Sequence, residues 1–250
     1  MAHLYRCTLT LLEATFFSSR EISTFYQTEP LLGNFALAYA LELCQSPYFN
    51  DGTIHYAADL RGLNAEGVYV TPGPVLGAPR FTLQAFNAQT DSYLSAMGQG
   101  YLAAPPEGGY IAREGANWYT YGPKGTERKK LRASNRPQYG RIRALAIGTR
   151  LRAHVISAVP LTLPGYIRLG KFMSKARVEV EGLPTIEEEA QEVTIAELLN
   201  PADLPPEISL HLFDLINVPP VPLVQNAVIS GPCYRLPGGG WLPRGMRFAT

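Results

Sequence analysis

The chain has 250 residues and a formal net charge of +1. It is long enough to bury a hydrophobic core without disulfides, and a hydrophobic content of 46% excludes intrinsic disorder as its overall state. Charges interrupt the first apolar stretch, and no apolar run approaches the roughly 18 residues of a membrane span, so we expect a cytoplasmic protein. The three cysteines lie far apart, which argues against a disulfide framework or a zinc site.

The N-terminal third predicts a strand, a helix and a second strand. Apolar and polar residues alternate over residues 5–11, as in a half-buried first strand. Apolar residues at helical spacing predict an amphipathic helix over residues 31–44. Residues 81–85 alternate as a further strand, and residues 93–123, rich in Gly, Pro and Tyr, are predicted to be mostly loop.

Positive charge is concentrated in the middle of the chain. Of the 22 Lys and Arg residues, 14 lie between Lys124 and Arg177, where Glu127 is the only acid. From Glu179 onward the sign reverses, with ten acidic residues against three arginines. A basic stretch of this size attracts polyanions, so it favours nucleic-acid contact over a solvated surface without a ligand.

Two predicted strands carry charged side chains at every second position. Over residues 150–155, apolar side chains alternate with Arg150, Arg152 and His154, which are therefore expected in a row on the outer face. Residues 174–181 repeat the alternation, with two cations and two acids outward. Strands that present spaced cations can contact successive phosphates without a helix in a groove, which points to RNA or single strands.

The remaining segments complete the predicted architecture. Residues 124–138 have no clear period and are predicted to form a basic loop or thumb, within a loop-rich insertion at about residues 93–140 of a single domain spanning residues 1–250. Residues 194–199 predict a short helix and residues 208–213 a late strand. The fold class expected from this order is α+β, with a ferredoxin-like or RNA-recognition-type β-sheet core and helices on one face.

The segment at residues 231–247 is rich in glycine. Gly238–Gly240 allow the backbone to approach a ligand closely and can form an anion-binding concavity. Trp241 follows directly, and its ring can stack on a base or fill the core. The sequence favours neither a ligand-binding loop with a stacking Trp241 nor a plain turn with Trp241 in the core.

No common catalytic motif is present in the sequence. It lacks a phosphate-binding P-loop, a nucleophile elbow, a zinc-binding HExxH and a complete GxGxxG, so we predict no cofactor or metal. The acidic run Glu187–Glu189 is expected to be a solvated turn. His154 is the one histidine predicted beside phosphate-binding cations, which leaves a metal-independent RNA-cleaving acid or base as an alternative.

Two segments carry a family resemblance. Residues 16–43 contain an aromatic pair, an Arg-Glu pair at residues 20–21 and an Asn-Phe-Ala-Leu run from Asn34. Residues 166–178 contain a Gly-Lys-Phe-Met-Ser-Lys stretch from Gly170. Together with the glycine-rich close, they resemble the Cas-five subunit of type I-D CRISPR Cascade, the Csc-one family, over essentially the whole chain.

The resemblance implies a ferredoxin-like RNA-recognition domain with a basic thumb. It also implies a non-catalytic subunit that caps the 5′ handle of CRISPR RNA in an antiviral surveillance complex, with target DNA nearby. The implied partners are the CRISPR RNA, a Cas-seven-type backbone subunit and a Cas-ten-like large subunit, without a membrane. Some relatives in other subtypes cut precursor CRISPR RNA, so an endoribonuclease is the alternative. A structural subunit that binds proteins but not isolated RNA also stays open.

Charge and resemblance together give a candidate RNA-binding set. Cations on the β-strands would hold handle phosphates, and those of the loop would grip the RNA strand. Arg20 and Asn34 are assigned to base edges or handle ends because the family signature falls there, and Tyr26 or Trp241 to stacking. The set comprises Arg20, Asn34, Lys129, Lys130, Arg132, Arg141, Arg143, Arg150, Arg152, Arg168, Lys171, Lys175, Arg177 and Trp241.

Overall fold

Strands dominate the fold. The computed structural model describes residues 2–44, 55–88, 107–115, 117–134 and 138–249. The strands form five sheets, and the helical elements of the described residues are α1 (Asn34–Ala40), α2 (Tyr56–Glu66) and the short 3-10 helices η1 (Pro123–Gly125) and η2 (Pro201–Asp203). The predicted ferredoxin-like α+β core is therefore wrong, because the chain is mostly β and divides its strands among separate sheets.

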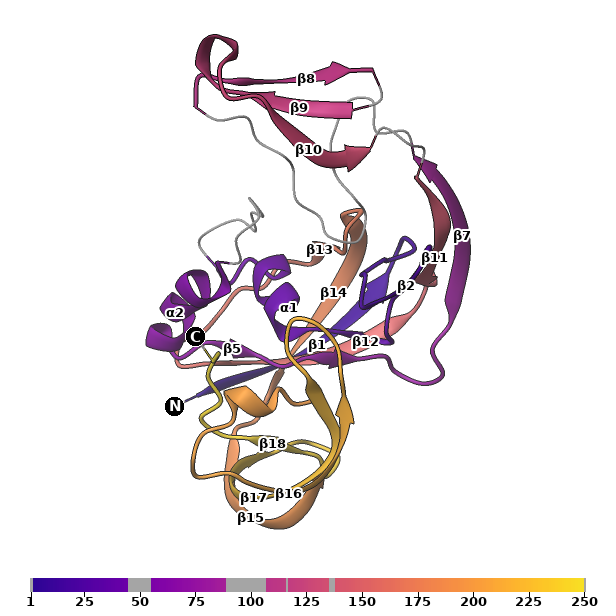
Figure 1. Cartoon of the computed structure of the whole chain (residues 1–250). Helices are drawn as coiled ribbons and strands as arrows, with labels where there is room; N and C mark the ends of the chain where they lie inside the picture. The colour runs from indigo at the N-terminus through magenta and orange to yellow at the C-terminus, as the bar shows by residue number, and fades with distance from the viewer. Residues whose placement is uncertain (1, 45–54, 89–106, 116, 135–137, 250) are drawn as a thin grey trace.

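The central sheet has the strand order β13-β14-β1-β12-β5 (Figure 1). Its strands are β1 (His3–Leu11), β5 (Tyr69–Val70), β12 (Arg150–Ser157), β13 (Tyr166–Leu169) and β14 (Ser174–Leu183). Cys7, Leu9 and Leu11 alternate along β1 and are fully buried, which confirms the first predicted strand. Helix α1 packs on this face, where Leu37 and Ala153 both border Gly73.

Two predicted helices differ from the structure. The helix expected over residues 31–44 is only α1, because Leu31–Leu32 form strand β4, which pairs with β6 (Gly73–Pro74). The helix expected over residues 194–199 is absent, because strand β15 continues through Ile195 and Leu199 then pairs with Val224 in an isolated bridge.

Two further sheets follow from the middle of the chain. One has the order β2-β3-β11-β7, with β2 (Arg20–Ile22), β3 (Phe25–Gln27), β7 (Phe81–Ala88) and β11 (Gln138–Leu145), and β7 confirms the strand predicted over residues 81–85. The other projects from the rest of the molecule in Figure 1 and consists of β8 (Tyr110–Glu114), β9 (Asn117–Tyr121) and β10 (Lys129–Ser134). The described residues between 107 and 134 thus form mainly an antiparallel sheet where a loop was predicted.

Residues 184–249 form a C-terminal lobe around a fourth sheet. Strand β17 lies between β15 and β16 and also pairs with β18; the four strands are β15 (Ile186–Ile195), β16 (Ser209–Ile216), β17 (Leu223–Arg235) and β18 (Trp241–Pro243). The acidic run expected as a turn lies on β15 instead. There Glu187 forms an ion pair with Arg244, and Glu188 lies 3.4 Å from Arg235.

A buried carboxylate connects this lobe to the rest of the fold. One oxygen of Asp203 accepts hydrogen bonds from the side chains of Asn34 at 2.7 Å and Tyr69 at 2.9 Å, and the other accepts from the backbone N–H of Ala249 at 2.8 Å. Burial raises the pKa of Asp203, and these donors oppose the rise. Among the described residues, neither α-helix has the length and apolar content to cross a membrane.

Candidate nucleic-acid interface

The outer face of the central sheet carries a row of side chains from four strands. Tyr166, Arg177, Thr10 and Arg150 lie directly opposite one another across β13, β14, β1 and β12. Opposed residues of antiparallel strands share a face, and neighbouring strands lie about 4.8 Å apart. The Cα atoms of Arg177 and Arg150 are therefore about 10 Å apart. Leu9 and Leu11 point into the core, so this row faces away from α1.

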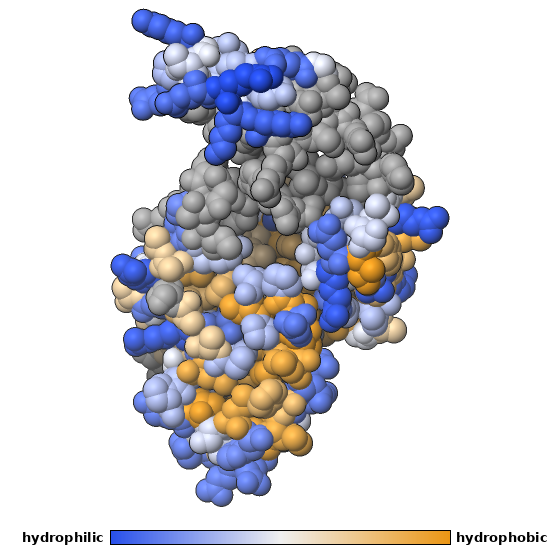
Figure 2. Space-filling view, viewed as in Figure 1, coloured by the Kyte–Doolittle hydropathy of each residue, from blue (hydrophilic) through white to orange (hydrophobic). Residues whose placement is uncertain are grey.

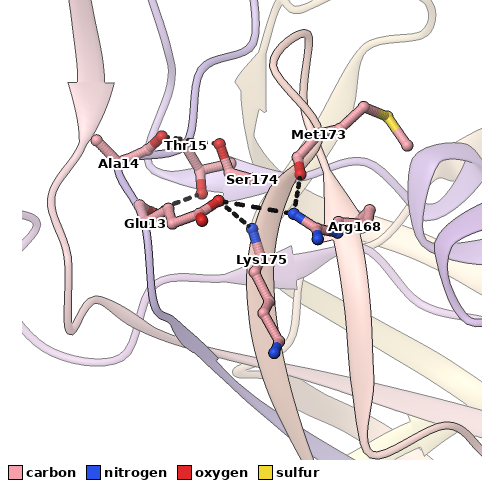
Figure 3. A network of polar contacts seen from close by, with 7 residues as sticks. All are labelled: Glu13, Ala14, Thr15, Arg168, Met173, Ser174 and Lys175. Atoms are coloured by element: carbon pink, nitrogen blue, oxygen red, sulfur yellow. Dashed lines mark hydrogen bonds and ion pairs between the residues drawn. The ribbon is translucent and has the colours of Figure 1, made fainter.

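The β13–β14 hairpin adds two more cations, Arg168 and Lys175, which lie opposite each other (Figure 3). A carboxylate oxygen of Glu13 accepts the backbone N–H of Lys175 at 2.7 Å and lies 3.9 Å from Arg168 Nη1. Arg168 also donates to the carbonyl of Met173 at 3.1 Å. Lys175 Nζ points away from this network and lies 4.6 Å from the centre of the Tyr166 ring. The hairpin is thus held in place while its cations stay accessible.

The turn of this hairpin presents apolar side chains. Phe172 is 51% exposed and Met173 60% exposed, and the Phe172 ring stacks on that of Phe16 with 5.5 Å between centroids. The backbone N–H of Lys171 donates to the carbonyl of Phe16 at 2.9 Å. Burial lowers the pKa of Lys171, and the nearby Glu21 opposes the fall. An exposed aromatic ring beside several cations is suited to stacking on an unpaired base.

Gly170 allows the turn to approach the backbone of Phe16. Its φ is +72°, and a Cβ added there would lie 2.5 Å from the carbonyl oxygen of Phe16. Gly170→Ala is therefore expected to lower the free energy of unfolding by about 1–3 kcal/mol, measured by urea denaturation. Gly165→Ala, at the other end of β13, is the matched control because its Cβ would meet nothing within 4 Å. Equal stability of the two variants would contradict this account.

Two cations farther from the hairpin turn, Arg177 and Arg152, have acidic partners. Arg177 lies 2.7 Å from Glu179, and both side chains are about half exposed, so this pair can exchange for a phosphate at little cost. Arg152 lies 3.0 Å from Glu197, whose side chain is only 5% exposed. Arg152 is thus paired with a buried carboxylate of the C-terminal lobe.

His154 is buried, which corrects its predicted position on an open row. Its side chain is 0% exposed, and neither ring nitrogen has a hydrogen-bond partner in the described structure. Burial, reinforced by the positive charges of Arg152 and Arg6, lowers the pKa of His154 to about 3. Glu197 lies 3.8 Å from Nδ1, so the C-terminal lobe covers this end of the sheet. A neutral, enclosed imidazole has no route to RNA on the surface.

The second sheet and the projecting sheet hold other predicted cations. Ile142 clusters with Phe16, so its neighbours Arg141 and Arg143 lie on the face of β11 away from the hairpin. The Arg143 guanidinium lies 4.3 Å from the centre of the Phe81 ring. The cations of β10, which lie in the projecting sheet rather than beside the hairpin, are Lys129, Lys130 and Arg132.

Three further predicted residues, Arg20, Asn34 and Trp241, do not lie on the central sheet. Arg20 forms an ion pair with Glu29 at the edge of the second sheet. Asn34 is 1% exposed and donates to Asp203, which gives it a structural role at the start of α1. Trp241 is half-buried against the core, with the Arg235 guanidinium 5.5 Å from its ring centre.

Sequence reasoning assigned no role to Glu13, Phe172 or Met173. In the sequence, Phe172 and Met173 were noted only as part of the family motif. Gly170, which precedes them, is the residue that indicates a tight turn. Glu13 gave no signal, because its contact with Lys175 joins residues far apart in the chain. Among the described residues, no group of three or more His, Cys, Asp or Glu is placed to hold a metal ion.

Comparison with known proteins identifies the family. The sequence profile of a family described as type I-D CRISPR-associated protein Cas5/Csc1 matches residues 2–250. No curated protein matches the chain. The profile covers almost every residue, including both segments that carry the resemblance, residues 16–43 and 166–178. The chain therefore belongs to the type I-D CRISPR-associated Cas5/Csc1 family.

Proposed function

We propose that this chain is a non-catalytic subunit of type I-D Cascade that binds the 5′ handle of CRISPR RNA and helps to position target DNA. The observation that carries the proposal is the cluster of cations on the outer face of the central sheet, which we call the hairpin cluster: Arg150, Arg168, Lys175 and Arg177. Family membership supplies the setting, which is a type I-D CRISPR complex.

The chemistry of the hairpin cluster suits a single-stranded backbone. Arginine offers a planar fork that matches phosphate oxygens, and lysine supplies a point charge on a flexible stem. A sheet surface can follow a backbone without entering a groove. The exposed ring of Phe172 provides a stacking surface for a base next to these phosphate contacts.

The same proposal includes the neighbours expected in the complex. A Cas-seven-type backbone subunit would continue along the RNA from the handle, and a Cas-ten-like large subunit would adjoin this chain. The lysines of the projecting sheet, Lys129 and Lys130, are exposed and would grip the RNA or the displaced DNA strand at a distance from the hairpin cluster.

Binding of handle RNA should depend steeply on salt. If about five phosphates are neutralised, the logarithm of affinity should fall against the logarithm of salt concentration with a slope of about −3.5. Fluorescence anisotropy with a labelled handle RNA, measured from low to physiological salt, provides the slope. A slope near zero would contradict phosphate binding by the hairpin cluster.

A gel assay with the same RNA tests the absence of catalysis. After incubation without metal, the handle RNA and a longer repeat RNA should remain intact on a denaturing gel. The histidine that could have cleaved RNA is enclosed, which disfavours the endoribonuclease alternative. Cleavage of repeat RNA by the purified chain would contradict the non-catalytic part of the proposal while leaving RNA binding in place.

A further inference from the structure

Strand β16 of the C-terminal lobe exposes a cluster of large apolar side chains. Leu212 is 68% exposed, Leu215 62% and Phe213 43%, all within four consecutive residues. Single exposed apolar residues are common on soluble proteins, but contiguous ones mark surfaces that another molecule covers. In Figure 2 much of the C-terminal lobe has a hydrophobic surface, unlike the hydrophilic projecting sheet.

The position of β16 leaves these side chains uncovered. In the sheet order β15-β17-β16, this strand is at the edge, and within the described residues only β17 pairs with it. Its register shifts twice, between Leu210 and Leu212 and between Leu212 and Asp214. Such bulges disrupt a regular ladder, so a partner would pack on the side chains rather than add a strand.

A groove continues from the end of β16. Its walls are the loop that joins β16 to β17, including Val218, Pro219 and Pro220, and the edge strand β2, including Ile22. Its volume is about 620 Å³. Ile22 is 60% exposed beside this groove. The strand and the groove together form what we call the β16 surface, defined by Leu212, Phe213, Leu215, Pro219, Pro220 and Ile22.

Most of the charge near the apolar part of this surface is negative, since Arg20, which lines the groove, is already paired with Glu29. The C-terminal lobe has eight Asp and Glu residues against three Arg and no Lys. Two of those arginines are already paired with acids of β15. Glu207, just before β16, and Asp214, within it, are both exposed. Among the described residues, Asp214 accepts a side-chain hydrogen bond from the neutral Asn226, at 2.7 Å.

We propose that the β16 surface docks an apolar segment, flanked by Lys or Arg, of another protein subunit of the type I-D complex. The acidic rim would repel an RNA backbone, and two copies of this lobe would bring like charges together. An apolar segment flanked by basic residues would cover the exposed leucines and form ion pairs with the acids. This inference rests on family membership and is independent of handle binding.

The test removes the apolar side chains without touching the hairpin cluster. The other protein subunits encoded with this chain are co-expressed with it, without CRISPR RNA, and the amount that co-purifies is measured. Leu212→Ser with Leu215→Ser is expected to lower the co-purified amount at least tenfold. Leu83→Ser, at an equally exposed leucine of β7, is the matched control and should change nothing.

Charge reversal provides a second variant that keeps the apolar surface. Glu207→Lys with Asp214→Lys should also weaken subunit binding, and more strongly at low salt than at high salt. Thermal melting of each variant confirms that it is folded. Affinity for handle RNA should stay at the wild-type value, which separates failure of this inference from failure of the proposed function.

Several results would overturn the inference. One is that no subunit co-purifies with the wild-type chain, and another is that the leucine variant assembles as well as wild type. A third is that wild type alone sediments as a dimer and the variant as a monomer, since the occupant would then be a second copy. Loss of RNA affinity in the leucine variant would assign the surface to RNA instead.

Discussion

Replacing Arg150 and Lys175 together with Glu is expected to weaken binding of handle RNA at least about 100-fold. Each would lose a charge-assisted contact worth about 1.5–3 kcal/mol, and about 1.4 kcal/mol corresponds to a tenfold change. The salt slope should become shallower by about 1.4, because two phosphates are no longer neutralised. Anisotropy titrations at several salt concentrations provide both values.

The double variant should fold normally, because neither side chain forms an ion pair with another described residue. Arg61→Glu with Arg247→Glu is the matched control, since it makes the same change in net charge at exposed positions outside the hairpin cluster. Equal losses in the two double variants would mean that net charge governs binding. No loss in the Arg150 and Lys175 variant would remove the hairpin cluster from the RNA site.

Asp203→Ala is expected to lower the free energy of unfolding by about 3–5 kcal/mol. The substitution leaves the Tyr69 hydroxyl and the Ala249 N–H without their acceptor and leaves the Asn34 amide only its 3.4 Å bond to Tyr69, and each unsatisfied buried group costs about 1–3 kcal/mol. Urea denaturation monitored by circular dichroism provides the value.

Two further substitutions separate charge from hydrogen bonding at this carboxylate. Asp203→Asn retains the shape and one acceptor oxygen, so it should destabilise less than Asp203→Ala. Asp214→Ala is the exposed control, since its carboxylate accepts a bond only from Asn226, and it should change stability by less than about 0.5 kcal/mol. If Asp203→Ala were as mild as Asp214→Ala, the buried network would contribute nothing to the fold.

Three of the five strands of the central sheet, β1, β12 and β14, could be predicted because their alternation is local. Residues 5–11, 150–155 and 174–181 each show which side chains share a face, and the structure agrees for the predicted inward residues except Val180, which is 41% exposed. The pairing of these strands could not be predicted, because their partners are far apart in sequence. Only the structure places β1 between β12 and β14 and so aligns Arg150 with Arg177.

Alternation also could not reveal what covers an outer face. His154 and Arg152 are on the predicted face, but Glu197 of the C-terminal lobe lies over them. The same limit applies to Asn34. Its place in a family signature suggested a contact with RNA, but its side-chain amide donates a hydrogen bond to Asp203. The strands of the projecting sheet escaped prediction because they are only five or six residues long and the segment around them is rich in Gly, Pro and Tyr.

The placement of β1 also affects how the chain folds during its synthesis. Strand β1 is synthesised before both of the strands that pair with it, and the second of these ends only at Leu183. Contacts between such distant residues form slowly, because the entropy of closing a long loop is lost before any pairing energy is gained. During synthesis β1 therefore keeps its apolar face exposed until both partner strands have been made, which makes this face a natural binding site for a chaperone.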